Sequence, residues 1–146
     1  MSIKLNKNNT LSTQTFNFIN LHPDAYPPID SQNLTLPDQT IYFDILDERT
    51  DEKQGFVMLQ KILKDEETFQ NEYELLMGCF DTNHHIASTV ICALLETAEV
   101  RALTNPSISV VIADTNEKLR KYMFPVLKSL DFEQQGDFMM TKFIRK

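Results

Sequence analysis

The segment from Cys79 to His85 gathers a thiol, a carboxyl group, a hydroxyl group and two adjacent imidazoles. It joins an apolar, strand-like run to a strongly helical one. The start of a helix at this junction would attract phosphate, because the first N–H groups of a helix are unpaired and the positive end of its dipole lies there. The segment has no glycine, the residue that normally lets a phosphate approach the backbone. The residue types therefore leave open whether this junction binds a phosphate or is only a structural turn.

The same residues suggest two other kinds of chemistry. Cys79, Asp81, His84 and His85 are potential metal ligands, with His22 as a distant helper. However, adjacent side chains on a helix diverge by about 100°, and known zinc sites use wider, paired spacings. Cys79 with a neighbouring imidazole as base is a conceivable nucleophile, but nothing marks its thiol as acidic, and a buried strand cysteine is commoner. We expect no metal site here.

Composition and charge limit the class of protein. The 146 residues suffice for one domain with a single core, and the hydrophobic fraction of 42% with ten Phe is that of a soluble globular chain. A net charge of −7 argues against non-specific nucleic-acid binding, which needs clustered basic residues. Acidity around residues 47–74 is compatible with a cationic partner. We expect a single domain over residues 1–146.

The sequence also bears on location. The N-terminal segment MSIKLNKNNT lacks the apolar core of a signal peptide. No apolar run approaches the roughly 18 residues needed to span a membrane. Cys79 and Cys92 form no C-x-x-C pair, and isolated cysteines of this kind favour free thiols in a reducing compartment. We expect a cytoplasmic protein without a membrane partner.

Hydrophobic patterning predicts the elements that must position these residues. Strands are expected over 2–5, 41–47, 55–63, 72–80, 107–115 and 138–144. Helices are expected over Leu11–Leu21, over His84–Leu103 and from Asp114 or Asn116 to about Leu130. Asp81, Thr82 and Asn83 are candidate caps of the second helix, and Pro125 should kink or restart the third.

The order of these elements predicts the architecture. Strands 41–47 and 55–63 flank a polar turn and form an antiparallel hairpin. The strand–helix–strand units should place parallel strands beside each other. We therefore expect an α/β fold with a mixed, mostly antiparallel central sheet and helices on both faces.

From residue 41 onward the chain resembles the GNAT superfamily of acyl-CoA-dependent N-acyltransferases. In that family a strand of type L-x-V leads into Arg/Gln-x-x-Gly-x-Gly/Ala and a long helix. Leu75 and Met77 stand at the strand positions, and 82-TNHHIA-87 falls on the loop. Thr82 then stands at the Arg/Gln position, His85 at the first glycine and Ala87 at the last small residue. The helix continuation ASTVICALLETA is also of the family's type.

A second match lies near the C-terminus. Family members carry an Asn at the start of the next helix and a Gly-Phe pair at its end. Asn116 and Asp131-Phe132 stand at these places, about one helical turn further apart than is usual. Tyr122 then stands where many members carry a tyrosine that protonates the leaving thiolate.

The resemblance implies acetyl-CoA as co-substrate and assigns roles to individual residues. The backbone from Met77 to Cys79 would pair with the pantetheine amides like an added strand. The pyrophosphate would lie at the helix start, and the cofactor-binding residues besides Met77 and Cys79 would be Thr82, His84, His85, Ile86, Ala87 and Asn116.

The same resemblance names candidate catalytic groups. Glu72 or Glu74 would accept the proton of the attacking amine, and Tyr122 would be the acid. Each has a structural alternative: the two glutamates could solvate a strand edge, and Tyr122 could be a core residue.

Two functions follow from the resemblance. The first is transfer of an acetyl or acyl group from CoA to a small-molecule or peptide amine. The alternative is a GNAT-like module that has lost CoA binding and acts through protein contacts. No glycine lies between residues 79 and 135, which is what disuse of a phosphate loop would leave. Edge strands could also pair two copies into a homodimer.

Overall fold

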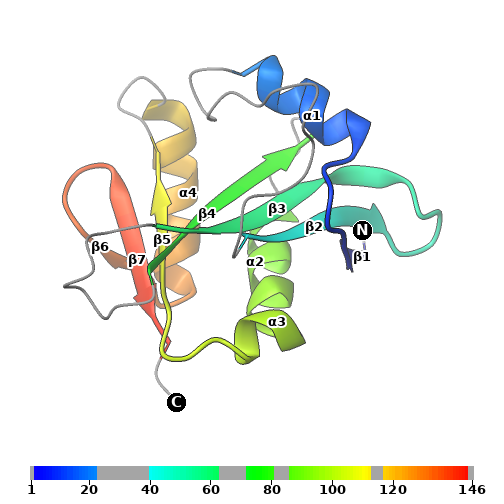
Figure 1. The fold of residues 1–146 in the computed structure, drawn as a ribbon. Coiled ribbons are helices and arrows are strands. Elements are labelled where there is room, and N and C mark those ends of the chain that lie inside the picture. Colours follow the sequence, from blue (N-terminus) through cyan, green and yellow to red (C-terminus); the bar gives the residue numbers. More distant parts are fainter. Residues whose placement is uncertain (1, 23–39, 63–71, 81–85, 113–116, 145–146) are drawn as a thin grey trace.

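The computed structural model describes residues 2–22, 40–62, 72–80, 86–112 and 117–144. The strands of this part are β1 Ile3–Lys7, β2 Thr40–Asp47, β3 Lys53–Lys61, β4 Glu72–Cys79, β5 Ser107–Val111, β6 Glu133–Gln134 and β7 Met139–Phe143. The helices are α1 Thr13–Asn20, α2 Ala87–Leu95, α3 Ala98–Arg101 and α4 Glu117–Ser129. Figure 1 shows their arrangement around one twisted sheet.

The sheet has the strand order β1-β2-β3-β4-β5-β7-β6. β4 and β5 pair in parallel, and the other pairings between the described strands are antiparallel. The predicted mixed, mostly antiparallel sheet is therefore confirmed. The expectation of parallel neighbours in strand–helix–strand units was wrong for the first and the last unit, since β1 and β2 are antiparallel and so are β5 and β7. The short strand β6 follows α4, and β7 then turns back and inserts between β6 and β5.

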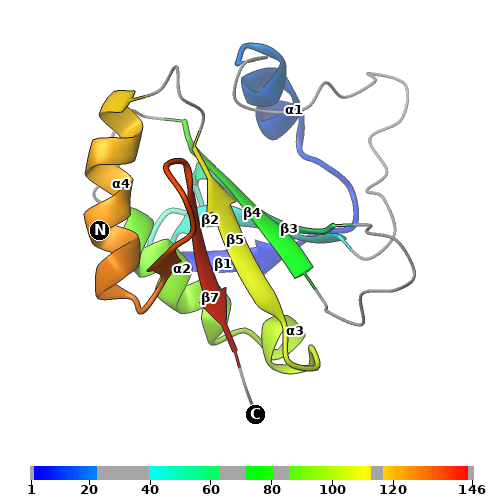
Figure 2. The same cartoon turned by 90° about the vertical axis from the view of Figure 1, so that its left-hand side faces the viewer.

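Strand alternation gives the sheet two apolar faces. Side chains such as Phe43 and Val57 join residues of α2 and α4 in the larger core. Their chain neighbours Tyr42 and Phe56 point the other way and join residues of α1 in a smaller core. Figure 2 shows α1 on one side of the sheet and α2 and α4 on the other. The predicted helices on both faces are confirmed.

A buried polar network fastens α1 to the sheet. The Thr15 hydroxyl lies 2.8 Å from that of Tyr42, which donates to Asp44 at 2.5 Å. Asn8 donates to the other carboxylate oxygen of Asp44, and Ser12 caps α1 by accepting from the Thr15 N–H. Burial and the Asp44 carboxylate raise the pKa of Tyr42 to about 12. Each buried polar group thus has the partner that its desolvation demands.

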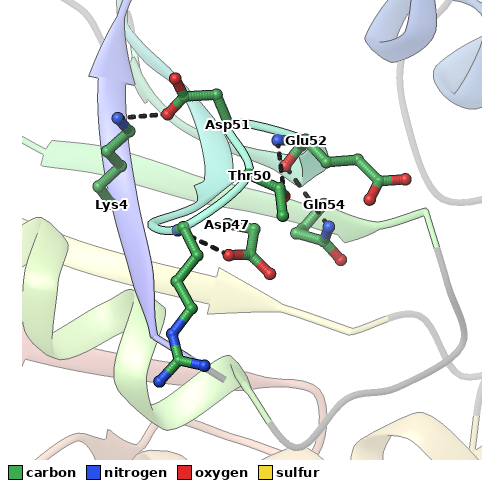
Figure 3. A network of polar contacts seen from close by, with 7 residues as sticks. Lys4, Asp47, Thr50, Asp51, Glu52 and Gln54 are labelled. Carbon is green, nitrogen blue, oxygen red and sulfur yellow. Dashed lines mark hydrogen bonds and ion pairs between the residues drawn. The ribbon is translucent and has the colours of Figure 1, made fainter.

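The predicted hairpin over β2 and β3 is also confirmed, and its polar turn is held by local contacts (Figure 3). Asp47 accepts from the backbone N–H of Arg49 at 2.8 Å. Asp51 adopts a positive φ of 59° and forms an ion pair of 2.5 Å with Lys4 of β1. Because both charged groups of this pair are exposed, we expect it to contribute little to stability.

One helix prediction needs correction. The expected continuous helix over His84–Leu103 is divided, because α2 ends at Leu95 and α3 starts after Thr97. The Thr97 hydroxyl donates to the Leu94 carbonyl and accepts from the Val100 N–H, so it replaces continuing helical bonds. Pro125 lies inside a single α4, so the helix does not restart there, and the alternative of a kink stays a prediction. Among the described residues, no helix is both long and apolar enough to span a membrane.

Candidate functional site

Strands β4 and β5 separate part-way along their length. Their parallel register covers Glu72 to Glu74 and Ser107 to Ser109. Beyond it β4 continues to Cys79 and stays paired with β3, where Cys79 lies opposite Gly55. Figure 1 shows β4 and β5 diverging toward their carboxyl ends. The parallel pairing of the two strands therefore ends at Glu74 and Ser109, and this end of the pairing is called the vertex.

Glycine allows α1 to pack closely on the diverging half of β4. A Cβ atom added at Gly78 would lie 2.5 Å from Cε1 of Phe56 and 2.6 Å from Cε1 of Phe18. The Phe18 ring of α1 also lies 5.6 Å from that of Phe80 and 4.4 Å from the His22 imidazole. An aromatic group from α1 therefore covers one side of β4 near its carboxyl end.

The vertex carries a half-buried carboxyl group. Glu74 points to the α1 face of the sheet, because Tyr73 and Leu75 on either side belong to the opposite core. Burial raises the pKa of Glu74. Among the described residues its side chain forms no hydrogen bond or ion pair, whereas Glu72 is engaged in an interaction. Glu74 is thus the carboxyl group better suited to accept a proton.

A pair of buried hydroxyls lies next to Glu74. Ser109 is its register partner on β5, and Thr141 is the register partner of Ser109 on β7. The two hydroxyl oxygens are 2.9 Å apart, and both residues are buried. With Gln60 of β3 opposite Glu74, polar residues form a row across four strands on one face. Neither Ser109 nor Thr141 was among the residues predicted from the sequence, although the alternation of SISVV already places Ser107 and Ser109 on one face.

No protein-family model and no curated protein sequence matches this chain. Solved structures do match it over nearly its full length. One shows mutant forms of the spermidine/spermine N-acetyltransferase SpeG from Vibrio cholerae, with 13% identity, a TM-score of 0.64 and coverage of 97% of this chain and 95% of that chain.

Two further structures carry acetyl-CoA. The GNAT superfamily phosphinothricin acetyltransferase from Sinorhizobium meliloti has 14% identity and a TM-score of 0.59, with coverage of 99% of this chain and 90% of that chain. The N-acetyltransferase PseH from Campylobacter jejuni has 12% identity and a TM-score of 0.54, with coverage of 99% of both chains. This chain has the GNAT fold.

Within the GNAT fold, the cofactor residues predicted from the sequence fall into two groups. Thr82, His84, His85 and Asn116 lie outside the described residues, as do the candidate caps at 81–83. The predicted start of the helix at His84 also lies outside the described residues. Within them, α2 begins at Ala87, and its N-cap, Ile86, makes no side-chain capping bond.

The described cofactor candidates lie on β4 and at the start of α2. Met77 is half-buried and packs against the larger core. Cys79 is buried, and its burial raises the pKa of the thiol, which disfavours the thiolate that nucleophilic chemistry needs. Ala87 is buried as the first residue of α2. Their part in cofactor binding stays a prediction.

The candidate acid, Tyr122, lies on α4 of the GNAT fold. Its side chain is half-buried against the larger core, so it belongs to the face of the sheet opposite Glu74. It is engaged in a contact of its own. The position fits the core role that the sequence analysis set beside the acid role, and the acid role stays a prediction.

Proposed function

We propose that this protein is an N-acyltransferase that transfers an acetyl or short acyl group from acetyl-CoA to an amine. The observation that carries the proposal is the parallel pair β4 and β5, whose register ends at Glu74 and Ser109. A half-buried carboxyl group with a raised pKa lies at that point. The GNAT fold and the two similar structures with acetyl-CoA support the same activity.

The two strands offer a place for an extended ligand. In the proposed complex, the edge of β4 that faces β5 takes the pantetheine amides as an added strand would. The first N–H groups of α2, at Ile86 and Ala87, lie where the pyrophosphate would rest, since a helix start favours anions. This arrangement brings the thioester end toward Glu74.

Glu74 acts as the general base in this proposal. It takes one proton from the protonated amine, which frees the nitrogen lone pair for attack on the thioester carbonyl carbon. The C–N bond forms, the nitrogen releases its second proton to solvent, the C–S bond breaks, and the sulfur leaves with a proton supplied by Tyr122 or by solvent. The raised pKa of Glu74 suits this role, because a base is most effective when its pKa approaches the working pH.

Thermal unfolding with and without acetyl-CoA tests the proposal. A ligand present at a hundred times its Kd stabilises the native state by about 2.7 kcal/mol, so the unfolding temperature should rise. ATP is the control, because it contains a pyrophosphate linkage as acetyl-CoA does but lacks pantetheine. No rise with millimolar acetyl-CoA would contradict the proposal and favour a GNAT-like module that acts through protein contacts.

The excess of acidic residues indicates only the chemical class of the acceptor amine. The chain carries 21 acidic and 14 basic residues, which favours a cationic amine such as a polyamine or a peptide amine. A panel of such amines, assayed by release of the CoA thiol, would identify it. The cytoplasmic location and the homodimer stay predictions.

A further inference from the structure

The side chains of Gln60 and Glu74 form a polar pair across the antiparallel strands β3 and β4. They are direct register partners, and both are half-buried. Register partners on adjacent strands point to the same face of a sheet, so Gln60 shares with Glu74 the face on which α1 lies (Figure 2). Neither side chain is bonded to another described residue, which leaves both head groups available to a ligand.

The pair lies at the border of the smaller core. Met58 and Leu76 are the next register partners on the same face, and both are buried in the apolar cluster under α1. Water is therefore partly excluded on that side of Gln60 and Glu74. Polar contacts between a ligand and the pair gain from this position, because hydrogen bonds are stronger where the local dielectric constant is low.

The spacing of the pair matches what one ammonium group needs. Register partners lie about 4.5–5.5 Å apart at Cβ. An ammonium nitrogen that donates two hydrogen bonds of about 2.8 Å at a tetrahedral angle needs acceptors about 4.6 Å apart. Since Gln and Glu side chains have the same length, both head groups reach the same height above the sheet. The terminal torsion of Gln60 is soft, so its amide can present the carbonyl oxygen to the nitrogen.

The other register partners of the row are less suited to this contact. Ser109, on the β5 side of Glu74, is buried, and its hydroxyl is bonded to that of Thr141. Thr40, on the β2 side of Gln60, is one strand further from Glu74. Among the described register partners of Glu74, Gln60 is therefore the one whose polar head can meet the carboxylate at a shared ligand atom.

We propose that Gln60 is an acceptor-binding residue, whose amide oxygen accepts one N–H of the substrate ammonium while the Glu74 carboxylate accepts another. The inference rests on the proposed function, in which Glu74 is the base. When Glu74 takes its proton, the bond to Gln60 keeps the nitrogen in place, so the new lone pair stays oriented toward the thioester. The acceptor is then a primary or secondary amine, because a tertiary ammonium has one N–H and cannot bond to both residues.

Binding of small cations to the free protein tests this contact without any need for turnover. The probes are n-butylamine and butyltrimethylammonium, because both carry one positive charge and only the first has N–H groups. n-Butylamine should shift the side-chain amide resonances of Gln60 in ¹⁵N NMR spectra, and butyltrimethylammonium should bind about tenfold more weakly. Equal binding of the two probes would overturn the inference, as would unchanged Gln60 resonances with n-butylamine.

Three variants assign the contact to Gln60. Gln60→Leu keeps a side chain of similar size without the amide and should weaken n-butylamine binding about tenfold. Gln60→Glu keeps an acceptor oxygen and should bind n-butylamine at least as tightly as the unaltered protein. Gln54→Leu is the matched control, since Gln54 lies on the same strand about 20 Å away, bonded to the Glu52 carbonyl. Equal weakening in Gln54→Leu and Gln60→Leu would contradict the assignment.

Turnover separates this inference from the proposed function. In Gln60→Leu the KM for the amine should rise about tenfold while kcat changes less, because the bond to Gln60 exists both before and during the reaction. If n-butylamine binds as expected but no amine is acetylated, the contact with Gln60 stands and the proposed function fails. If amines are acetylated and Gln60→Leu has an unchanged KM, the function stands and the inference fails.

Discussion

Glu72 and Glu74 differ in their surroundings although both lie on the same face of one strand. Glu72 is engaged in an interaction, whereas Glu74 is half-buried and forms none with a described residue. Burial raises the pKa of Glu74, because a charged carboxylate is less stable away from water. A base must be free to receive a proton, so Glu74 is the better candidate.

Glu74→Gln should therefore reduce kcat by about 10²- to 10⁴-fold, the usual contribution of a general base. The shape of the side chain is kept, so the rise in unfolding temperature with acetyl-CoA should persist. Glu72→Gln is the matched control and should retain most of the activity. Full activity of Glu74→Gln in an acetylation assay would remove Glu74 from the mechanism.

In the interior, the hydroxyl of Tyr42 forms the centre of a buried hydrogen-bond network. Tyr42→Phe removes the hydroxyl that joins Thr15 to Asp44 and leaves the buried carboxylate with one donor fewer. The free energy of unfolding should fall by about 1–3 kcal/mol, as measured by urea denaturation. Tyr73→Phe is the control, since Tyr73 is also buried but its hydroxyl has no bond to another described residue; an equal loss there would refute the role of the network.

At the scale of elements, two glycines set how closely β3, β4 and α1 approach. A Cβ atom at Gly55 would lie 2.1 Å from the carbonyl oxygen of Gly78, whereas one at Gly78 would meet the ring edges of Phe18 and Phe56. Backbone atoms of a paired strand cannot move aside, but aromatic rings can turn. The two glycines therefore differ in how well they tolerate a methyl group.

Gly78→Ala should lower the free energy of unfolding by about 1–3 kcal/mol, as overpacking usually does. Gly55→Ala should lower it at least as much as the upper end of that range. Chemical denaturation of both variants checks the order. A Gly55→Ala protein as stable as the unaltered chain would show that β3 and β4 do not approach as described.

Local sequence patterns could predict some of the strands and helices and not others. The strands that became β2, β3 and β4 and the hairpin between the first two follow from local alternation of apolar residues. The division of the long helix at Thr97 does not, because it depends on a threonine hydroxyl bonding to Leu94 and Val100. The antiparallel pairing of β5 with β7 depends on the two-residue strand β6, which is too short to carry a pattern.

For the whole molecule, the buried network predicts a loss of stability at high pH. The folded protein holds the Tyr42 proton more tightly than the unfolded chain does, since the pKa rises from 10.0 to about 12. The stabilisation is therefore complete below pH 10.0 and is lost as the pH rises through about 12.

Urea denaturation across this pH range checks the prediction. The unaltered protein should lose stability more steeply than Tyr42→Phe, which has no phenol at this position. Parallel curves for the two proteins would mean that Tyr42 ionises in the folded state as easily as in the unfolded chain.

The sequence by itself determined the type and order of most elements, the two-sided sheet and the candidate carboxylates, because these depend on residues close together in the chain. Only the tertiary structure decided which carboxyl group lies at the vertex without a partner among the described residues, and that a serine of β5 meets a threonine of β7. Ser109 and Thr141 are 32 positions apart. Their contact depends on strand order and register, which are set by packing across the whole sheet and leave no local pattern in the chain.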